Sequence, residues 1–184
     1  MTDSSPPHRR RVRYAGTHPR RFEDKYKELD PSIEQHGLEI QKAIARGQTP
    51  AGMHRSICIN EILGILNPQP GETGLDATLG FGGHAQALIP RTQPGGRLFG
   101  LDVDPIELPR TTLRLRALGF DESMLIVRHE NFCKVNELLP LTRGGFDFVL
   151  ADLGVSSMQI DNPSRGFSFR ASGPLDLRLD PGGG

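Results

Sequence analysis

The sequence predicts an α/β fold with a mostly parallel sheet, of which this chain supplies the first four strands. Strand-like and helix-like segments alternate four times between residues 51 and 151, an order that produces right-handed crossovers and a parallel sheet. The segment 146–151 is nearly all apolar, as expected of a strand that is buried on both faces. A glycine-rich loop follows the first strand, where sheets of this class bind ligands.

The strands and helices follow one another in a regular order. An amphipathic helix over 57–66 ends at Asn67–Pro68 and precedes the first strand. Asp104 is a suitable N-cap for the helix after the second strand, because Pro105 fits a first helical turn. The strands are expected at 73–78, 97–101, 125–128 and 146–151, with helices starting near 85, 104 and 134.

Charge divides the chain into two parts. Residues 1–27 hold eight Lys or Arg and three acidic residues, whereas the whole chain has a net charge of zero. We therefore expect a basic, polar N-terminal extension over 1–50, followed by one α/β unit over 51–184. A basic arm on an acidic body suits a polyanion such as nucleic acid. A solvated tail without a partner is the alternative.

Composition excludes several protein classes. No run of about 18 apolar residues is present, so a membrane span is not expected. The N-terminus lacks the apolar segment of a secretory signal. Cys58 and Cys133 are far apart and indicate neither a disulfide framework nor a metal site. The sequence thus predicts a cytoplasmic protein without a metal.

The loop Gly80–Ala85 fits the nucleotide-binding pattern G-x-G-x-x-A. Glycine allows a tight turn and a close approach of the backbone to a ligand, and the following helix offers free N–H groups. Asp102 ends the second strand about 20 residues later, where an acid accepts hydrogen bonds from ribose hydroxyls. Helix capping is the alternative role for Asp102, but Asp104 is better placed for it.

Two further strand ends carry candidate ligand groups. Phe132 follows the third strand and offers a ring for an adenine, although a core position is the simpler interpretation. Asp152 ends the fourth strand. Ligands of open α/β sheets lie outside the carboxyl ends of the strands, so these groups should meet the glycine loop in one crevice.

The pattern alone leaves two cofactors open. An acid after the second strand suits the ribose of NAD and of S-adenosylmethionine equally well. S-adenosylmethionine has no pyrophosphate but carries an ammonium and a sulfonium, so acidic residues near the strand ends favour it. Composition does not decide between them.

Six motifs occur in an order that resembles the ribosomal RNA small-subunit methyltransferase H family (RsmH, also called MraW). The match covers about residues 53–181, and its most specific part runs from Asp152 to Asp180. The motifs are Thr78–His84, Gly100–Pro105, Asn131–Phe132, Asp152–Asp161, Arg165–Phe169 and Gly173–Arg178.

This resemblance implies a Rossmann-like, S-adenosylmethionine-dependent methyltransferase. Its implied reaction is methyl transfer to N4 of a cytidine in the decoding region of 16S rRNA, in the small ribosomal subunit. Residues 51–184 would then be the N-terminal part of the methyltransferase domain. By motif, the implied cofactor-binding residues are Gly82, Gly83, His84, Asp102, Phe132, Asp152 and Gln159.

Asp152 is also the candidate catalytic residue. The N4 amine is a poor nucleophile because its lone pair is delocalised into the ring, so an acceptor for an N4 hydrogen would direct that lone pair at the methyl group. The side chains of Arg165, Phe167, Phe169 and Arg178 are candidates for lining the approach of the base. The alternative is a packed lid with both phenylalanines in the core.

The sequence departs from the family at both ends. The extension precedes the usual start, and the chain stops at Gly184, before the family's helical insert and further strands. We therefore expect a fragment whose fourth strand is a bare, apolar edge. The competing functions are an inactive or truncated S-adenosylmethionine- or RNA-binding fragment and, on the glycine pattern alone, an NAD(P)-dependent oxidoreductase.

Overall fold

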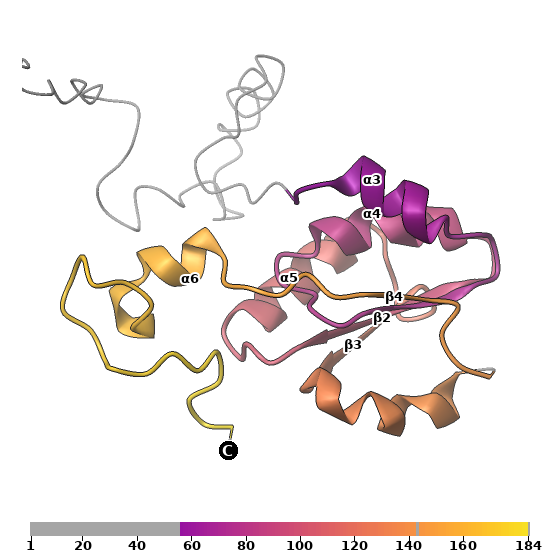
Figure 1. Ribbon diagram of the computed structural model, residues 1–184. Coiled ribbons are helices and arrows are strands. Elements are labelled where there is room, and N and C mark those ends of the chain that lie inside the picture. Colours follow the sequence, from indigo (N-terminus) through magenta and orange to yellow (C-terminus); the bar gives the residue numbers. More distant parts are fainter. Residues whose placement is uncertain (1–55, 143, 184) are drawn as a thin grey trace, which may run out of the picture. The chain divides into compact units, whose positions relative to one another are not determined.

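One parallel sheet organises the described part of the chain. The computed structural model describes residues 56–142 and 144–183, so the expected extension over 1–50 lies outside it. The strand order is β3-β2-β1-β4 and all neighbours run parallel, which confirms the predicted sheet (Figure 1). The strands are β1 (Thr73–Asp76), β2 (Arg97–Asp102), β3 (Leu125–His129) and β4 (Phe148–Leu150).

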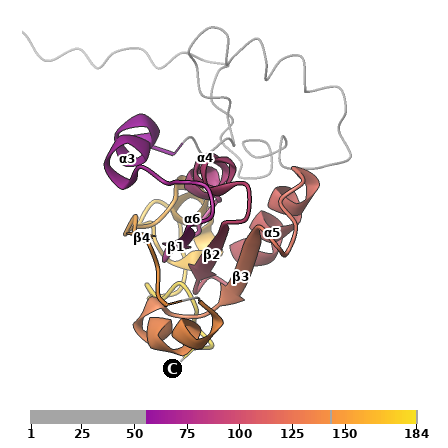
Figure 2. The same ribbon diagram turned by 90° about the vertical axis from the view of Figure 1, so that its right-hand side faces the viewer.

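Helical segments connect the strands and lie on both faces of the sheet. Figure 2 shows α3, α4 and α5 together on one side of the strands and the 3-10 segment η3 on the other. This arrangement confirms the predicted alternation of strands and helices. The helical segments are α3 (Ile59–Leu66), α4 (Gly83–Thr92), α5 (Glu107–Ala117), η3 (Phe132–Leu141), α6 (Ser157–Asp161) and η4 (Pro163–Arg165).

Two apolar clusters hold these layers together. Successive residues of a strand point to opposite faces, so Leu98 joins Leu88 and Leu115 beneath α4 and α5. Its neighbour Phe99 packs instead with Leu138 of η3. The alternation in β2 therefore fixes the glycine loop's helix on one face and η3 on the other.

Strand β4 differs from its prediction. It was expected to be buried along 146–151, but β4 covers only Phe148–Leu150, and Val149 is 52% exposed. The prediction of a fully buried strand is wrong because β4 is the last strand of the described sheet, with a neighbour on one side only. The expectation of an apolar edge is confirmed.

The start of α5 also differs from its prediction. The helix begins at Glu107, with Ile106 in the N-cap position, rather than at Asp104–Pro105. Asp104 Oδ1 nevertheless accepts hydrogen bonds from the backbone N–H groups of Ile106 and Glu107, at 2.9 and 3.1 Å. Asp104 thus stabilises the turn that leads into the helix, without being its N-cap.

The described residues show no membrane-spanning helix, no metal-binding cluster and no disulfide. None of the helices in 56–142 and 144–183 is long and apolar enough to cross a membrane. The same residues contain no group of three or more His, Cys, Asp or Glu placed to hold a metal ion. Cys58 and Cys133 are free and exposed.

Candidate functional site

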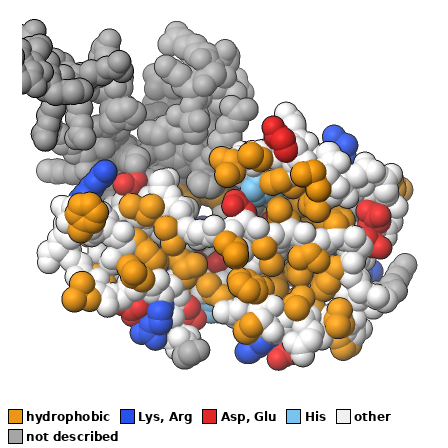
Figure 3. All heavy atoms as spheres, viewed as in Figure 1, with side chains coloured by type: hydrophobic (Ala, Val, Ile, Leu, Met, Phe, Trp, Pro, Cys, Tyr) orange, Lys and Arg blue, Asp and Glu red, His pale blue; other side chains and the backbone are white. Residues whose placement is uncertain are grey.

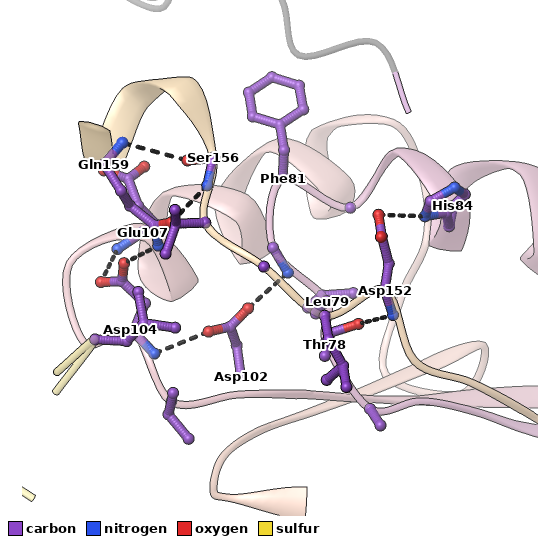
Figure 4. Close-up of a pocket in the computed structure, with 18 of the residues that line it drawn as sticks. Thr78, Leu79, Phe81, His84, Asp102, Asp104, Glu107, Asp152, Ser156 and Gln159 are labelled. Atoms are coloured by element: carbon purple, nitrogen blue, oxygen red, sulfur yellow. Dashed lines mark hydrogen bonds and ion pairs between the residues drawn. The ribbon is translucent and has the colours of Figure 1, made fainter. Parts of the chain in front are cut away.

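A pocket of about 400 Å³ opens at the carboxyl ends of β1, β2 and β4. This volume falls within the range of small-molecule sites. The pocket brings together the glycine loop and the residues that follow each strand, as the sequence predicts (Figure 4). All seven expected cofactor residues line it: Gly82, Gly83, His84, Asp102, Phe132, Asp152 and Gln159.

The glycine loop needs glycine for two reasons. Gly82 has φ +80°, and a Cβ there would lie 2.8 Å from Leu115 Cδ1 and 3.1 Å from Thr111 Cγ2 on α5. A Cβ on Gly83 would meet the Ser56 hydroxyl. The loop is therefore packed between α5 and the segment before α3, and neither wall leaves room for a side chain.

Asp102 ties the glycine loop to the end of β2. Its Oδ2 accepts a hydrogen bond from the Gly80 N–H at 2.6 Å, and its Oδ1 accepts one from the Asp104 N–H at 2.8 Å (Figure 4). Each carboxylate oxygen has a second lone pair, so the acid can still accept a hydrogen bond from a ligand. Asp102 is half-buried at the pocket wall, in the place where the sequence predicts a ribose acceptor.

His84 and Asp152 face each other across the pocket. His84 Nδ1 lies 3.9 Å from Asp152 Oδ2, and His84 Nε2 lies 3.0 Å from the Ile57 carbonyl oxygen. The Asp152 N–H donates to Thr78 Oγ1 at 2.7 Å, which fixes the backbone at the end of β4. The His84 ring is buried, whereas the Asp152 side chain remains 44% exposed and accessible to a ligand.

Phe132 lies on the pocket wall at the start of η3 and is 46% exposed. The simpler interpretation of this residue, a buried core phenylalanine, is therefore wrong. The preceding Asn131 accepts a hydrogen bond from the Cys133 N–H at 2.9 Å through its side chain. This cap holds the first turn of η3, and with it the backbone that carries the ring.

Gln159 lines the pocket, but its side-chain amide is hydrogen-bonded to other residues of the chain. The side chain accepts a hydrogen bond from the Ser156 N–H at 2.7 Å and donates one to Asp104 Oδ2 at 2.6 Å. Ser156 in turn accepts from the Gln159 N–H, which completes a capping box at the start of α6. In this arrangement, Gln159 fastens α6 to the pocket wall.

Asp104 is a junction that the sequence interpretation missed. Its carboxylate is buried and accepts hydrogen bonds from both terminal nitrogens of Arg165, at 3.2 and 3.0 Å. Burial by itself raises the pKa of Asp104, but the hydrogen bonds from Arg165 and Gln159 outweigh it, so the pKa lies below its usual value. The spacing of 61 residues between Asp104 and Arg165 left no local signal.

Asp76 is the second residue that was missed. It ends β1 with 1% exposure, its Oδ1 accepts from the Thr78 N–H at 3.1 Å, and its Oδ2 has no hydrogen-bond partner among the described residues. Burial raises its pKa to about 6, and the nearby Asp102 and Asp152 contribute in the same direction. An acid within the segment predicted as the first strand, 73–78, was the signal that could have revealed it.

The residues expected to line the base's approach fall into two groups. Arg165 is buried and donates to Asp104 and to the Leu179 carbonyl oxygen, and its guanidinium lies 5.9 Å from the ring centre of Phe167. Phe169 is fully exposed, and Arg178 is exposed and paired with Asp176. The packed-lid alternative therefore holds for Arg165, while a core position for Phe169 is wrong.

Comparison with known proteins agrees with this geometry. Residues 51–183 match the model of the MraW methylase family. The chain is 54% identical over 177 residues to ribosomal RNA small subunit methyltransferase H 1 of Agathobacter rectalis, an alignment that covers 96% of this chain and 50% of that protein. It is 56% identical over 175 residues to ribosomal RNA small subunit methyltransferase H 2 of Alkaliphilus metalliredigens, covering 95% and 49%.

The chain therefore spans about half the length of the curated relatives it matches. Both alignments include the glycine loop, the four strand ends and the segment that carries Gln159 and Arg165, because they cover nearly all of this chain. On this match and these identities, the chain belongs to the MraW methylase family.

Proposed function

We propose that this chain carries the S-adenosylmethionine-binding part of a methyltransferase that acts on N4 of a cytidine in 16S rRNA. The observation that supports this most is the convergence of the glycine loop, Asp102, Phe132 and Asp152 on one pocket in a chain of this family. The target in the decoding region follows from the motif resemblance. The partner would be the small ribosomal subunit, and the setting would be the cytoplasm.

The chemistry of the pocket fits a cationic ligand. Its described lining contains the acidic residues Asp102, Asp104, Glu107 and Asp152 and no lysine or arginine. Asp104 and Glu107 are already paired with Arg165 and Arg110, so Asp102 and Asp152 are the carboxylates that would face a cation. The buried Asp76 adds a further carboxyl group behind this wall. S-adenosylmethionine carries an ammonium and a sulfonium, whereas the pyrophosphate of NAD is anionic and would meet these acids unfavourably. The lining therefore favours S-adenosylmethionine.

Each lining residue has a role that its position supports. Asp102 would accept hydrogen bonds from the ribose hydroxyls with the lone pairs that Gly80 and Asp104 leave free. The exposed face of Phe132 would lie against the adenine. Gly82 and Gly83 would let the backbone approach the ligand. His84 and Gln159 would shape the wall, because their side chains are bound to Ile57 and Asp104.

Asp152 would orient the nucleophile. When bound, S-adenosylmethionine would supply a methyl group for in-line displacement: N4 would gain the methyl group, sulfur would keep the electron pair of the broken S–C bond, and the amine would lose one proton to solvent water. A carboxylate that accepts a hydrogen bond from N4 directs the nitrogen lone pair at the methyl group and favours that proton loss. Asp152 is the exposed carboxylate at the end of β4, and Thr78 holds its backbone in place.

A cytidine has to leave its stack to reach a pocket of this kind. Asp152 lines this pocket and its side chain is 44% exposed, so its carboxylate would be accessible to an unstacked base. An RNA segment whose bases are already unpaired would meet a smaller unstacking cost. This requirement favours a loop or junction as the target over a regular helix.

Calorimetric titration tests the cofactor. The chain should bind S-adenosylmethionine and should not bind NAD. Asp102→Asn should weaken binding by about tenfold or more, since it disturbs a charge-assisted network at the wall. Asp147→Asn is the matched control, because the Asp147 carboxylate also accepts a backbone hydrogen bond, from the Thr73 N–H at 2.7 Å, but lies at the start of β1 and β4, at the opposite end of the strands from the pocket. Binding of NAD but not S-adenosylmethionine would reject the proposal.

The activity is tested in a full-length relative, because this chain spans half of one. Replacement of the residue equivalent to Asp152 by Ala should lower the rate of methylation of small subunits that lack the modification. Cofactor affinity should change much less than the rate if the carboxylate orients the amine. Unchanged affinity and unchanged rate would remove Asp152 from the site.

A further inference from the structure

Two side chains of helix α5 donate hydrogen bonds to backbone carbonyl oxygens of the glycine loop. Thr111 Oγ1 donates a hydrogen bond to the Gly80 carbonyl oxygen at 2.6 Å. Three residues later, on the same face of the helix, Arg114 donates to the Phe81 carbonyl oxygen. Arg114 also donates to Thr111 Oγ1 at 3.2 Å, so the two helix side chains form one connected unit.

Arg114 contacts the ring of the loop as well as its backbone. Its guanidinium carbon lies 3.4 Å from the centre of the Phe81 ring, a cation–π contact. Burial lowers the pKa of Arg114 to about 10, and nearby Glu107 opposes this shift, so the group remains charged at neutral pH. Figure 4 shows the Phe81 ring pointing away from Asp102 and Asp152, which leaves the carboxylates on the ligand side of the loop.

We propose that Thr111 and Arg114 are positioning residues that hold the glycine loop in its cofactor-binding conformation. Gly80 and Gly82 both have positive φ, at +51° and +80°, and glycine loses more conformational freedom on ordering than any other residue. A loop that is already ordered binds its ligand without that cost. Asp102 holds the loop through the Gly80 N–H, while α5 holds it through two carbonyl oxygens. The inference rests on the proposed function.

The same helix offers a matched control. Arg116, like Arg114, makes two hydrogen bonds through its guanidinium, in this case to the carbonyl oxygens of Phe120 and Leu125 at 2.6 and 2.9 Å. These carbonyls lie beyond the end of α5 rather than in the glycine loop. Arg116→Met therefore removes a comparable set of bonds without touching the loop. Thr111→Val removes only the hydroxyl bond to Gly80 and keeps a methyl group of similar size.

The test compares Arg114→Met, Thr111→Val and Arg116→Met in the whole chain by two measurements. Calorimetry gives the affinity for S-adenosylmethionine, and hydrogen exchange with mass spectrometry gives the protection of the loop amides without ligand. We expect Arg114→Met to weaken affinity at least about tenfold, which corresponds to losing one charged hydrogen bond. It should also speed exchange in the loop. Arg116→Met should change affinity less than about threefold, even where its overall stability falls as much.

Arg114→Lys refines the result. Lysine keeps the charge but lacks the planar fork that reaches the carbonyl and stacks on the ring together, so it should not restore full affinity. Equal effects of Arg114→Met and Arg116→Met on loop exchange and on affinity would overturn the inference. If the unmodified chain binds no S-adenosylmethionine, the proposed function fails, whereas loop exchange still decides whether Arg114 and Thr111 hold the loop.

Discussion

The carboxylate of Asp104 and the guanidinium of Arg165 lie 3.0 Å apart although 61 residues separate them in the sequence. Both side chains are buried, at 1% and 5% exposure. Arg165 also donates to the Leu179 carbonyl oxygen at 2.8 Å. One ion pair therefore joins the end of β2 to the segment that carries η4 and to the C-terminal part of the described chain.

Removing Arg165 should destabilise the fold strongly. Arg165→Met leaves the Asp104 carboxylate buried without its main partner, a change that typically costs about 3–5 kcal/mol. Urea unfolding followed by circular dichroism measures the loss. Arg178→Met is the matched control because Arg178 pairs with Asp176 on an exposed surface, and it should change stability little. Similar losses in the two variants would mean that the buried pair has no special role.

Asp76 should make the chain more stable in mild acid than at neutral pH. Its folded pKa is about 6 and its ordinary value is 3.8, so between these values the folded state binds a proton that the unfolded state has released. The free energy of unfolding therefore falls as pH rises from about 4 to 6, by about 3 kcal/mol for this group. Asp76→Asn should remove that slope and stabilise the chain at pH 7–8.

Unfolding curves at several pH values test this prediction. Asp121→Asn is a control of opposite sign, because hydrogen bonds from Ser123 lower the pKa of Asp121. The contribution of Asp121 is present above its unfolded pKa and is lost as pH falls, so its removal should flatten the acid side of the profile. An Asp76→Asn chain that keeps the original slope between pH 4 and 6 would refute the assignment.

The sequence predicted the sheet and the place of the pocket because both depend on local patterns. Strand periodicity, the glycine loop and an acid after β2 are each visible within a few residues. The rule that strand ends meet at one edge of a parallel sheet then brings Asp102, Phe132 and Asp152 together. The structure confirms their convergence on one pocket.

The missed features depend on contacts between distant segments. Arg165 was expected near the RNA, yet its partner is Asp104, which no local pattern connects to it. The hydrogen bond from Arg114 to the Phe81 carbonyl oxygen joins residues that are 33 positions apart. Its prediction would require knowing how α5 crosses the loop. Residue type and spacing carry no information on these pairings.

Gly82→Ala should destabilise the chain by more than its backbone conformation alone explains. A positive φ in alanine costs roughly 1–2 kcal/mol. At Gly82 the new methyl group would also lie 2.8 Å from Leu115 Cδ1, and overpacking of this kind typically adds about 1–3 kcal/mol. Gly119→Ala is the matched control, with φ +92° and nothing within 4 Å of the new Cβ.

The difference between these two glycine variants isolates the packing term. Thermal or urea unfolding gives both stabilities, and affinity for S-adenosylmethionine should fall for Gly82→Ala alone, because α5 and the loop have to move apart. Equal destabilisation of the two variants would show that the loop does not pack tightly against Leu115. If the methyl group of Gly82→Ala clashes with Leu115, the two substitutions should be coupled: Leu115→Ala should cost less stability in the Gly82→Ala chain than in the unmodified chain.

Strand β4 should be a site of self-association. Val149 is 52% exposed on β4, and Leu139, Leu141 and Leu153 are exposed at 49%, 47% and 70%. Figure 3 shows hydrophobic side chains gathered over β4 and η3 on the face viewed in Figure 1. β4 has a neighbour on one side only within the described sheet. An exposed apolar edge strand presents unpaired backbone groups to another chain.

A lysine on this edge should block that pairing. Val149→Lys should slow the growth of light scattering on concentration or mild heating, and it should change stability by no more than about 0.5 kcal/mol, because the side chain is exposed. Leu113→Lys is the matched control, since Leu113 is 70% exposed on α5 and lies on a helix rather than a strand. If both lysines reduce scattering equally, general hydrophobicity rather than the strand edge drives association. Slower scattering in Val149→Lys alone identifies the open β4 edge as its cause.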